Sequence, residues 1–239
     1  MNKLIIDNVD ELSELIIHED TELIINLKDS FGFVNIDVMD NICLYVIYIG
    51  NNTKNKVKYN LRENSKLIVN KLIVNSSDDI EINLNGMNSS VKYNTGIIND
   101  TNNNYKEIIN HNYSNTDSLI FTHAINMNES NLILDIDAKV SNDSMNCMTN
   151  QDNKIINKSC GKSEIKPNLI VDNNLIDATH SAYIGNFNPN IVFYLQTRGI
   201  AKENIEKMLS MGFLLENMNL NTDEKTKFEN FIKNYVVGR

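Results

Sequence analysis

The chain has 239 residues, 41% of them hydrophobic, and a formal net charge of −9 at pH 7. This length can bury a core as one domain, and the acidic balance argues against nucleic acid and anionic membrane as main partners. Residues 1–10 lack the features of a signal peptide, and no apolar run approaches transmembrane length. Three cysteines give no disulfide framework and, without a secretion signal, predict a cytoplasmic protein.

Strand-like runs dominate the first two thirds of the chain. The segment VDELSELI fits a short amphipathic helix within residues 1–18, and alternating or apolar runs separated by Asn, Asp, Ser and Gly follow it. The expected strands are 23–27, 33–38, 42–49, 57–61, 66–74, 80–84, 91–98, 105–109, 119–123, 132–138, 154–156 and 169–171. Because two-residue hairpin turns are scarce, the pattern favours a solenoid but leaves a β-helix and a β-sandwich open.

Helical patterns begin near residue 188. Asn188 can cap a first helix, Pro189 suits its first turn and Gly199 can end it. Its apolar stripe, which ends in a cation, consists of Ile191, Val192, Tyr194, Leu195 and Arg198. A second helix is expected over 202–211, closed by Gly212, and a third over 222–237.

The junction between strands and helices carries a recognisable motif. Residues 177–200 read DATHSAYIGNFNPNIVFYLQTRGI, and Gly212-Phe213 follow. This stretch resembles the SufB/SufD family of iron–sulfur cluster assembly scaffolds, which have a strand ending in a histidine and then Leu-Phe-Tyr-Leu-x-x-Arg-Gly-Ile. Two further matches lie upstream: Lys166-Pro167-Asn168-Leu169, and the set His111, Asn115, Thr116 and Ser118. The resemblance spans roughly residues 105–213.

This resemblance implies a right-handed β-helix core over 1–185 and a C-terminal helical segment over 186–239. The helical segment would dock a SufC-like ABC ATPase, with contacts expected at Phe193, Tyr194, Arg198, Met208 and Phe213. The core would pair with a second SufB/SufD-type scaffold, here as a homodimer. The complex would build a transient iron–sulfur cluster and pass it to acceptor proteins.

The chain itself is not expected to be an enzyme. It has no Gly-x-x-x-x-Gly-Lys-Ser/Thr loop, so ATP hydrolysis is assigned to the partner. The alternative is a SufD-like β-helical interaction subunit without a cluster site of its own.

Cys160 and His180 are the leading candidates for cluster or iron ligands. Clusters favour thiolates, with imidazole or carboxylate as substitutes. Cys160 lies 20 residues before His180, close to one circuit of a coil, so the two are expected on neighbouring turns. The structural alternatives are a buried cysteine in a turn and a hydrogen-bonded core histidine.

Departures from the family pattern leave the rest of the site open. The scaffold cysteine of SufB members, about nine residues before Cys-Gly, is replaced here by Gln151. Ser181 likewise stands where SufB members have an acid after the histidine. A carboxylate could come from Glu164, which on a strand would share a face with Cys160, or from Asp177.

The two other cysteines are weaker candidates. Cys147 could serve as a displaced thiolate, although its surroundings carry no ligand spacing. Cys43 lies in an apolar run and is expected in the core.

Overall fold

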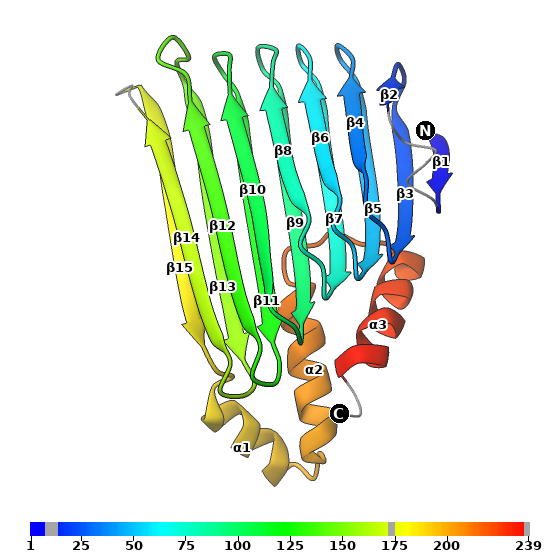
Figure 1. Cartoon of the computed structure of the whole chain (residues 1–239), viewed down its shortest axis with the longest axis vertical. Coiled ribbons are helices and arrows are strands. Elements are labelled where there is room, and N and C mark those ends of the chain that lie inside the picture. Colours follow the sequence, from blue (N-terminus) through cyan, green and yellow to red (C-terminus); the bar gives the residue numbers. More distant parts are fainter. Residues whose placement is uncertain (8–13, 172–174, 237–239) are drawn as a thin grey trace.

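The computed structural model describes residues 1–7, 14–171 and 175–236, which form a parallel β-solenoid followed by three helices (Figure 1). Successive strands alternate between two sheets, and every strand pair of the described chain is parallel. This confirms the mainly β, solenoid class. A β-sandwich would instead require antiparallel neighbours.

We call the two sheets the odd-strand sheet and the even-strand sheet. The odd-strand sheet has the order β1 (Asn2–Ile6), β3 (Thr21–Lys28), β5 (Cys43–Asn51), β7 (Lys66–Val74), β9 (Ser90–Asn99), β11 (Asp117–Asn126), β13 (Cys147–Asn157) and β15 (Ile176–Gly185). The even-strand sheet has the order β2 (Glu14–Ile17), β4 (Phe33–Val38), β6 (Lys56–Leu61), β8 (Asp79–Leu84), β10 (Asn103–His111), β12 (Asn131–Val140) and β14 (Lys162–Val171).

The core lies between the two sheets, because alternate residues of each strand point inward. In-register positions stack along the axis, as in the column formed by Val46, Val69, Tyr93 and Ile120. All four side chains are buried. The strict alternation that predicted half-buried strands therefore reflects an inner face that is filled coil by coil.

Asparagine, rather than glycine, closes many of the turns. Nine described non-glycine residues have positive φ: one is Asp29 and the other eight are asparagines. Asn41, Asn64 and Asn88 occupy equivalent turns and are linked by side-chain hydrogen bonds of 3.0 Å. Asparagine tolerates this left-handed conformation better than other side chains, which explains how a chain with nine glycines forms so many tight turns.

The coils lengthen along the chain. Asparagines at equivalent turns are 23 residues apart near the N-terminal end (Asn41 and Asn64) and 31 residues apart near the other end (Asn115 and Asn146). The last three odd strands are correspondingly long, at 10 or 11 residues each. The later coils therefore enclose a wider interior.

Three helices follow the last strand: α1 (Pro189–Thr197), α2 (Lys202–Leu214) and α3 (Thr222–Val236). α2 and α3 lie against the outer face of the odd-strand sheet (Figure 1). Their buried Leu214, Phe228 and Ile232 pack on a second apolar cluster that includes Ile47 and Ile125. Asn188 caps α1 by accepting a hydrogen bond from the backbone N–H of Asn190, and Gly199 follows it with φ of 81°, as predicted.

Two expectations about helices were wrong. Of the segment proposed as an N-terminal helix, Glu14–Ile17 is a strand paired with β4, while residues 8–13 lie outside the described chain. Gly212 does not end the second helix, which continues to Leu214. The buried Leu214 side chain favours this extra turn, so tertiary packing overrides the local stop signal.

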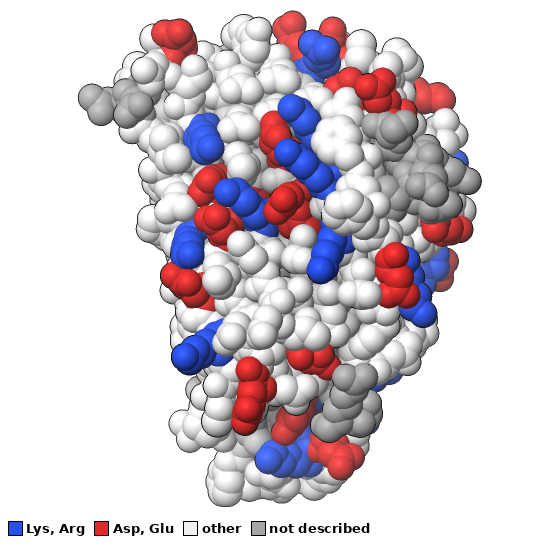
Figure 2. Space-filling model, in the orientation of Figure 1, with Lys and Arg blue, Asp and Glu red and all other residues white. Residues whose placement is uncertain are grey.

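The described helices include none that is long and apolar enough to cross a membrane. On the face shown in Figure 2, acidic and basic side chains are intermixed.

Candidate functional site

His180 lies near the middle of β15, the last strand of the odd-strand sheet. It is in register with Gln151 of β13, and both belong to the set of alternate positions that face the solenoid interior. Gln151 is fully buried, whereas His180 is exposed because no further described strand stacks beyond β15. His180 therefore stands at the open end of the interior, accessible to a ligand or a second chain.

Cys160 is exposed in the turn between β13 and β14 and does not stack on His180. The last position of β15, Gly185, is in register with Ile156, so Cys160 lies beyond the end of that strand. His180 is five residues before Gly185, so about 17 Å of strand separates His180 from Gly185 at 3.3 Å per residue. Cys160 lies farther from His180 than that along the strand direction. The expected stacking was wrong because coils at this end are about 30 residues long, as the 29-residue spacing of Asp152 and Ser181 shows.

Close packing explains why glycine follows Cys160. A Cβ atom on Gly161 would clash with the carbonyl oxygen of Ser130 in the preceding coil. The Cys-Gly pair therefore lies in a turn that packs tightly on its neighbour and presents the thiol to solvent.

The carboxylate candidates point away from His180. Glu164 is exposed on β14 of the opposite sheet, where its side chain lies 3.5 Å from Lys166 Nζ. The expected common face with Cys160 does not arise, because β14 begins only at Lys162. Asp177 is on β15 but three positions from His180, hence on the opposite face of that strand. Neither carboxylate joins His180 within one chain.

The remaining cysteines differ from one another. Cys147 is buried at the start of β13, where its sulfur accepts a 3.3 Å hydrogen bond from Thr116 Oγ1. Cys43 is half-buried on the outer face of the odd-strand sheet rather than in the core as expected. Burial raises the pKa of the Cys43 thiol and so disfavours its thiolate.

Within the described ranges, no three histidine, cysteine, aspartate or glutamate side chains gather as metal ligands. The predicted ligands Cys160 and His180 thus lie apart in the single chain. A cluster held by both would require groups from a second subunit.

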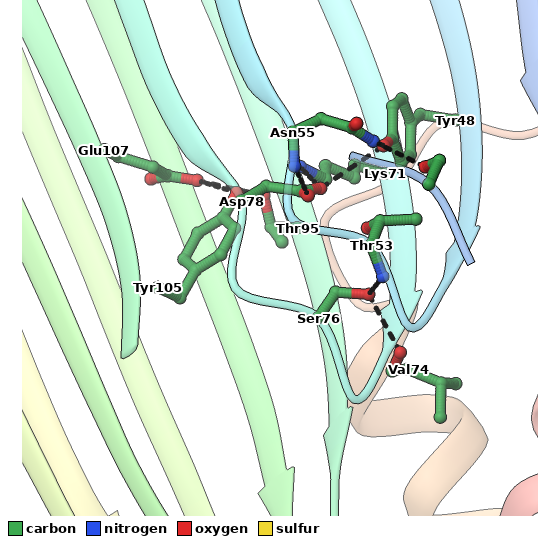
Figure 3. A network of polar contacts seen from close by, with 11 residues as sticks. Tyr48, Thr53, Asn55, Lys71, Val74, Ser76, Asp78, Thr95, Tyr105 and Glu107 are labelled. Atoms are coloured by element: carbon green, nitrogen blue, oxygen red, sulfur yellow. Dashed lines mark hydrogen bonds and ion pairs between the residues drawn. The ribbon is translucent and has the colours of Figure 1, made fainter. Parts of the chain in front are cut away.

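A buried polar network occupies the interior of the middle coils (Figure 3). Lys71 Nζ lies 2.8 Å from Asp78 Oδ2, and both side chains are fully buried. The same ammonium group lies over the rings of Tyr48 and Tyr105, at 4.6 and 5.2 Å from their centroids. Asp78 also accepts a 2.8 Å hydrogen bond from the backbone N–H of Asn55. The charges are therefore compensated rather than isolated.

Glu107 continues this network toward the later coils. Its carboxylate accepts hydrogen bonds from Tyr105 Oη at 2.8 Å and from Thr95 and Thr122 Oγ1, each at 3.1 Å. Burial raises the pKa of Glu107, although these three donors and the Lys71 charge oppose the shift. Sequence patterns missed Glu107 because a single acid in a strand is usually exposed.

Farther along the axis, two buried amides are incompletely bonded. Gln151 Oε1 and both polar atoms of Asn153 lack hydrogen-bond partners within the described chain. Both residues are on β13 and fully buried, directly behind the open coil that carries His180. Buried amides of this kind indicate a polar interior beneath the candidate ligand.

His111, part of the resemblance motif, is fully buried at the end of β10. Its Nδ1 is 2.8 Å from Thr116 Oγ1 and its Nε2 is 2.9 Å from Ser118 Oγ. Burial lowers the pKa of His111 to about 4. The neutral imidazole therefore joins the end of β10 to the start of β11 within one coil.

The residues expected to contact a partner separate into two groups. On α1, Phe193 and Tyr194 are 67% and 55% exposed, and this helix buries no side chain. Arg198 and Met208 are also exposed. Phe213, in contrast, is half-buried and stacks on His123, at 4.8 Å between ring centroids. Phe213 is thus already engaged within the chain.

Comparison with known proteins agrees with this geometry. The profile described as "SUF system FeS cluster assembly, SufBD core domain" matches residues 9–213. The iron–sulfur cluster assembly protein SufD of Bacillus subtilis (strain 168) is 25% identical over 100 residues. This match covers 41% of the present chain and 23% of the relative, so the chain spans only a small part of that protein's length. The chain belongs to the SufB/SufD family of proteins involved in iron–sulfur cluster assembly.

Proposed function

We propose that this chain is a scaffold subunit of a SUF-type assembly complex, on which a nascent iron–sulfur cluster is built as cargo and passed to acceptor proteins. The observation that carries the proposal is the open last coil. There, the exposed His180 stands in register with the buried amide of Gln151. An imidazole in this position could ligate iron or relay a proton.

A second copy of the scaffold would complete the site. In the described sheets, β14 and β15 each have a neighbour on one side only, which leaves backbone donors and acceptors available for pairing. Exposed Ile170, Tyr183 and Ile184 add apolar area at this end. We therefore propose a homodimer whose shared interface supplies the ligands that one chain does not bring together.

A SufC-like ABC ATPase would dock on the helical segment. Phe193 and Tyr194 of α1 offer exposed aromatic rings, which are common anchors at interfaces. Between α2 and α3 lies a groove of about 500 Å³, lined in part by Met208, Met211 and Met218. Flexible methionine side chains suit an adaptable contact. ATP hydrolysis by this partner would drive assembly.

One observation favours the alternative of a SufD-like interaction subunit without its own cluster site. Gln151, which replaces the scaffold cysteine of SufB members, is the residue in register with His180. A carboxamide cannot provide the thiolate that clusters favour. As an interaction subunit, the chain would hold the ATPase and a cluster-bearing partner together.

Anaerobic reconstitution with iron and sulfide tests the cluster site. Iron and sulfide content per chain should fall in Cys160→Ser and His180→Ala and remain unchanged in Cys43→Ser, which removes a half-buried thiol on another face. If neither candidate substitution lowers cluster content, the interaction-subunit role replaces the scaffold role.

Co-purification with a SufC-like ATPase from the same genome tests the docking surface. Phe193→Asp should abolish the complex, whereas Phe31→Asp should not, because Phe31 is even more exposed than Phe193 but lies in the turn between β3 and β4. Failure of the unmodified chain to form any complex would count against the proposed partner.

A further inference from the structure

His123 lies between the helical segment and the last coils of the solenoid. It is on the outer face of β11, only 2% exposed, beneath the C-terminal end of α2. Its Nδ1 is 2.9 Å from the carbonyl oxygen of Phe213, and its ring stacks on the Phe213 ring at an interplanar angle of 10°. A carbonyl oxygen can only accept, so Nδ1 carries the proton that makes this bond.

The other side of the imidazole faces the strand beside the candidate site. His123 Nε2 is 3.6 Å from Asp152 Oδ2 on β13 and makes no hydrogen bond within the described chain. Asp152 Oδ1 in turn accepts a 2.5 Å hydrogen bond from Ser181 Oγ on β15. Asp152 directly follows Gln151, and Ser181 directly follows His180. The chain of contacts thus ends one residue from the proposed ligand.

Charged side chains surround the contact between His123 and Asp152. Lys154 Nζ is 2.8 Å from Asp152 Oδ2 and 3.8 Å from Glu216 Oε2, while Glu216 lies 3.7 Å from His123 Nδ1. Burial alone would raise the pKa of Asp152, but hydrogen bonds with Lys154 and Ser181 and the Lys154 charge bring it below its ordinary value. Asp152 therefore stays ionised and keeps its acceptors for Ser181 and Lys154.

The sheet is shaped to admit the helix end at this place. Gly96 of β9 is the in-register neighbour of His123, and a Cβ on Gly96 would lie 3.2 Å from the carbonyl oxygen of Leu214. A larger residue at Gly96 would crowd the end of α2. Phe187, which follows β15, also touches the Phe213 ring edge-on, at 6.2 Å between centroids.

We propose that His123 is a positioning residue that couples the end of α2, through Asp152 and Ser181, to the strand that carries His180. The importance of this coupling for cluster assembly rests on the proposed function, because an ATPase docked on the helices would then act on the candidate ligand. The coupling itself requires neither the ATPase nor a cluster, so it can be tested on the chain alone.

Hydrogen exchange followed by mass spectrometry provides the test. Ser181→Ala removes an exposed hydroxyl that touches no residue of α2, and the variant should fold normally. Exchange should become about fivefold faster in residues 179–185, the effect of losing one typical hydrogen bond, and also rise in residues 211–216. Thr179→Ala, on the same outer face of β15, is the matched control and should leave 211–216 unchanged.

Two substitutions of His123 separate the two halves of the connection. In His123→Asn the amide nitrogen takes the place of Nδ1, so the bond to Phe213 can persist while the contact with Asp152 is lost. In this background Ser181→Ala should no longer affect 211–216. His123→Ala should loosen both 211–216 and 179–185.

Tyr45→Phe is a second control, because it removes the bonds from Tyr45 to Glu224 and to the carbonyl oxygen of Asn219 and should accelerate exchange from residue 219 onward but not in 211–216. The proposal is overturned if the Ser181→Ala effect stays within β15. It is also overturned if that effect reaches α2 with asparagine at position 123, which would assign the route to Phe187. Absence of ATPase binding would refute the proposed function and leave these exchange results standing.

Discussion

We expect His111 to make folding strongly pH-dependent below neutrality, and His111→Asn to remove that dependence. The imidazole is fully buried and bonded to the hydroxyl groups of Thr116 and Ser118. In its neutral form one ring nitrogen donates and the other accepts, which suits these partners. A second proton would place a buried charge with no carboxylate among its hydrogen-bond partners.

The magnitude follows from the difference between the two pKa values. Burial lowers the pKa of His111 from 6.5 to about 4. The unfolded chain therefore binds a proton first as the pH falls, and stability is lost from pH 6.5 downward until the folded protein also binds it near pH 4. A difference of about 2.5 units corresponds to about 3.4 kcal/mol, of which about 2.6 kcal/mol is already lost at pH 4.5.

Urea unfolding monitored by circular dichroism between pH 7.5 and 4.5 measures this effect. The free energy of unfolding of the unmodified chain should approach a slope of about 1.4 kcal/mol per pH unit below pH 6 from this group alone. His111→Asn lowers stability at every pH, but its difference from the unmodified chain should shrink by about 2.6 kcal/mol from pH 7.5 to 4.5.

His18→Asn is the matched control, since His18 is exposed. Its pH profile should run parallel to that of the unmodified chain. Parallel profiles for His111→Asn would instead show that the imidazole is not held neutral and buried, and the reasoning would fail.

Three further predictions concern the solenoid interior and its turns. Asp78→Ala leaves the buried Lys71 ammonium unpaired and should cost about 3–5 kcal/mol in urea unfolding, whereas a loss below about 1 kcal/mol would contradict the buried ion pair. Burial raises the pKa of Glu107, so its contribution to stability is present below pH 4.5 and is lost as the pH rises. Glu107→Gln should therefore gain stability relative to the unmodified chain as the pH rises from 4.5 to 7. A difference in unfolding free energy between the two chains that does not change with pH would refute this. Asn64→Val should be about 1–2 kcal/mol less stable than Asn64→Gly by thermal unfolding, because φ at this position is 55° and both variants lose the same side-chain bonds to Asn41 and Asn88; equal effects would contradict a left-handed turn.

Local patterns predicted the elements that carry alternating or continuous apolar residues. The bounds expected for 33–38 and 66–74 coincide with β4 and β7. α1 was predicted from its cap and its terminal glycine, because both act within a few residues.

Strands whose inward-facing side chains are polar were not predicted by these local patterns. Only residues 154–156 were expected as a strand in the region of β13, which begins at Cys147. Its inward positions Thr149, Gln151 and Asn153 are polar and fully or almost fully buried, so no apolar alternation marks the first half of the strand. What these positions face is set by neighbouring strands and coils, as in the hydrogen bond that Ser118 of β11 donates to Thr149, and local sequence does not describe it.

The candidate site was predicted in part. The motif correctly marked the junction of β15 and α1, whereas the role of His180 as a ligand stays a prediction. The 20-residue spacing between Cys160 and His180 was taken as one circuit, but the coils at this end are 31 and 29 residues long, as the register of Ile120 with Gln151 and of Gln151 with His180 shows. Register across coils therefore could not be inferred from the spacing of two residues.

The asparagine turns have a consequence for how such chains diverge. At a position with positive φ, glycine and asparagine both meet the backbone requirement, so exchange between them changes the sequence while the turn persists. Most inward positions require a side chain of suitable volume and apolar character, which Ile, Leu and Val all provide. Mutational drift can therefore erase identity over whole coils while strand register survives, which is how a chain can match its family over residues 9–213 and a family member at 25% identity.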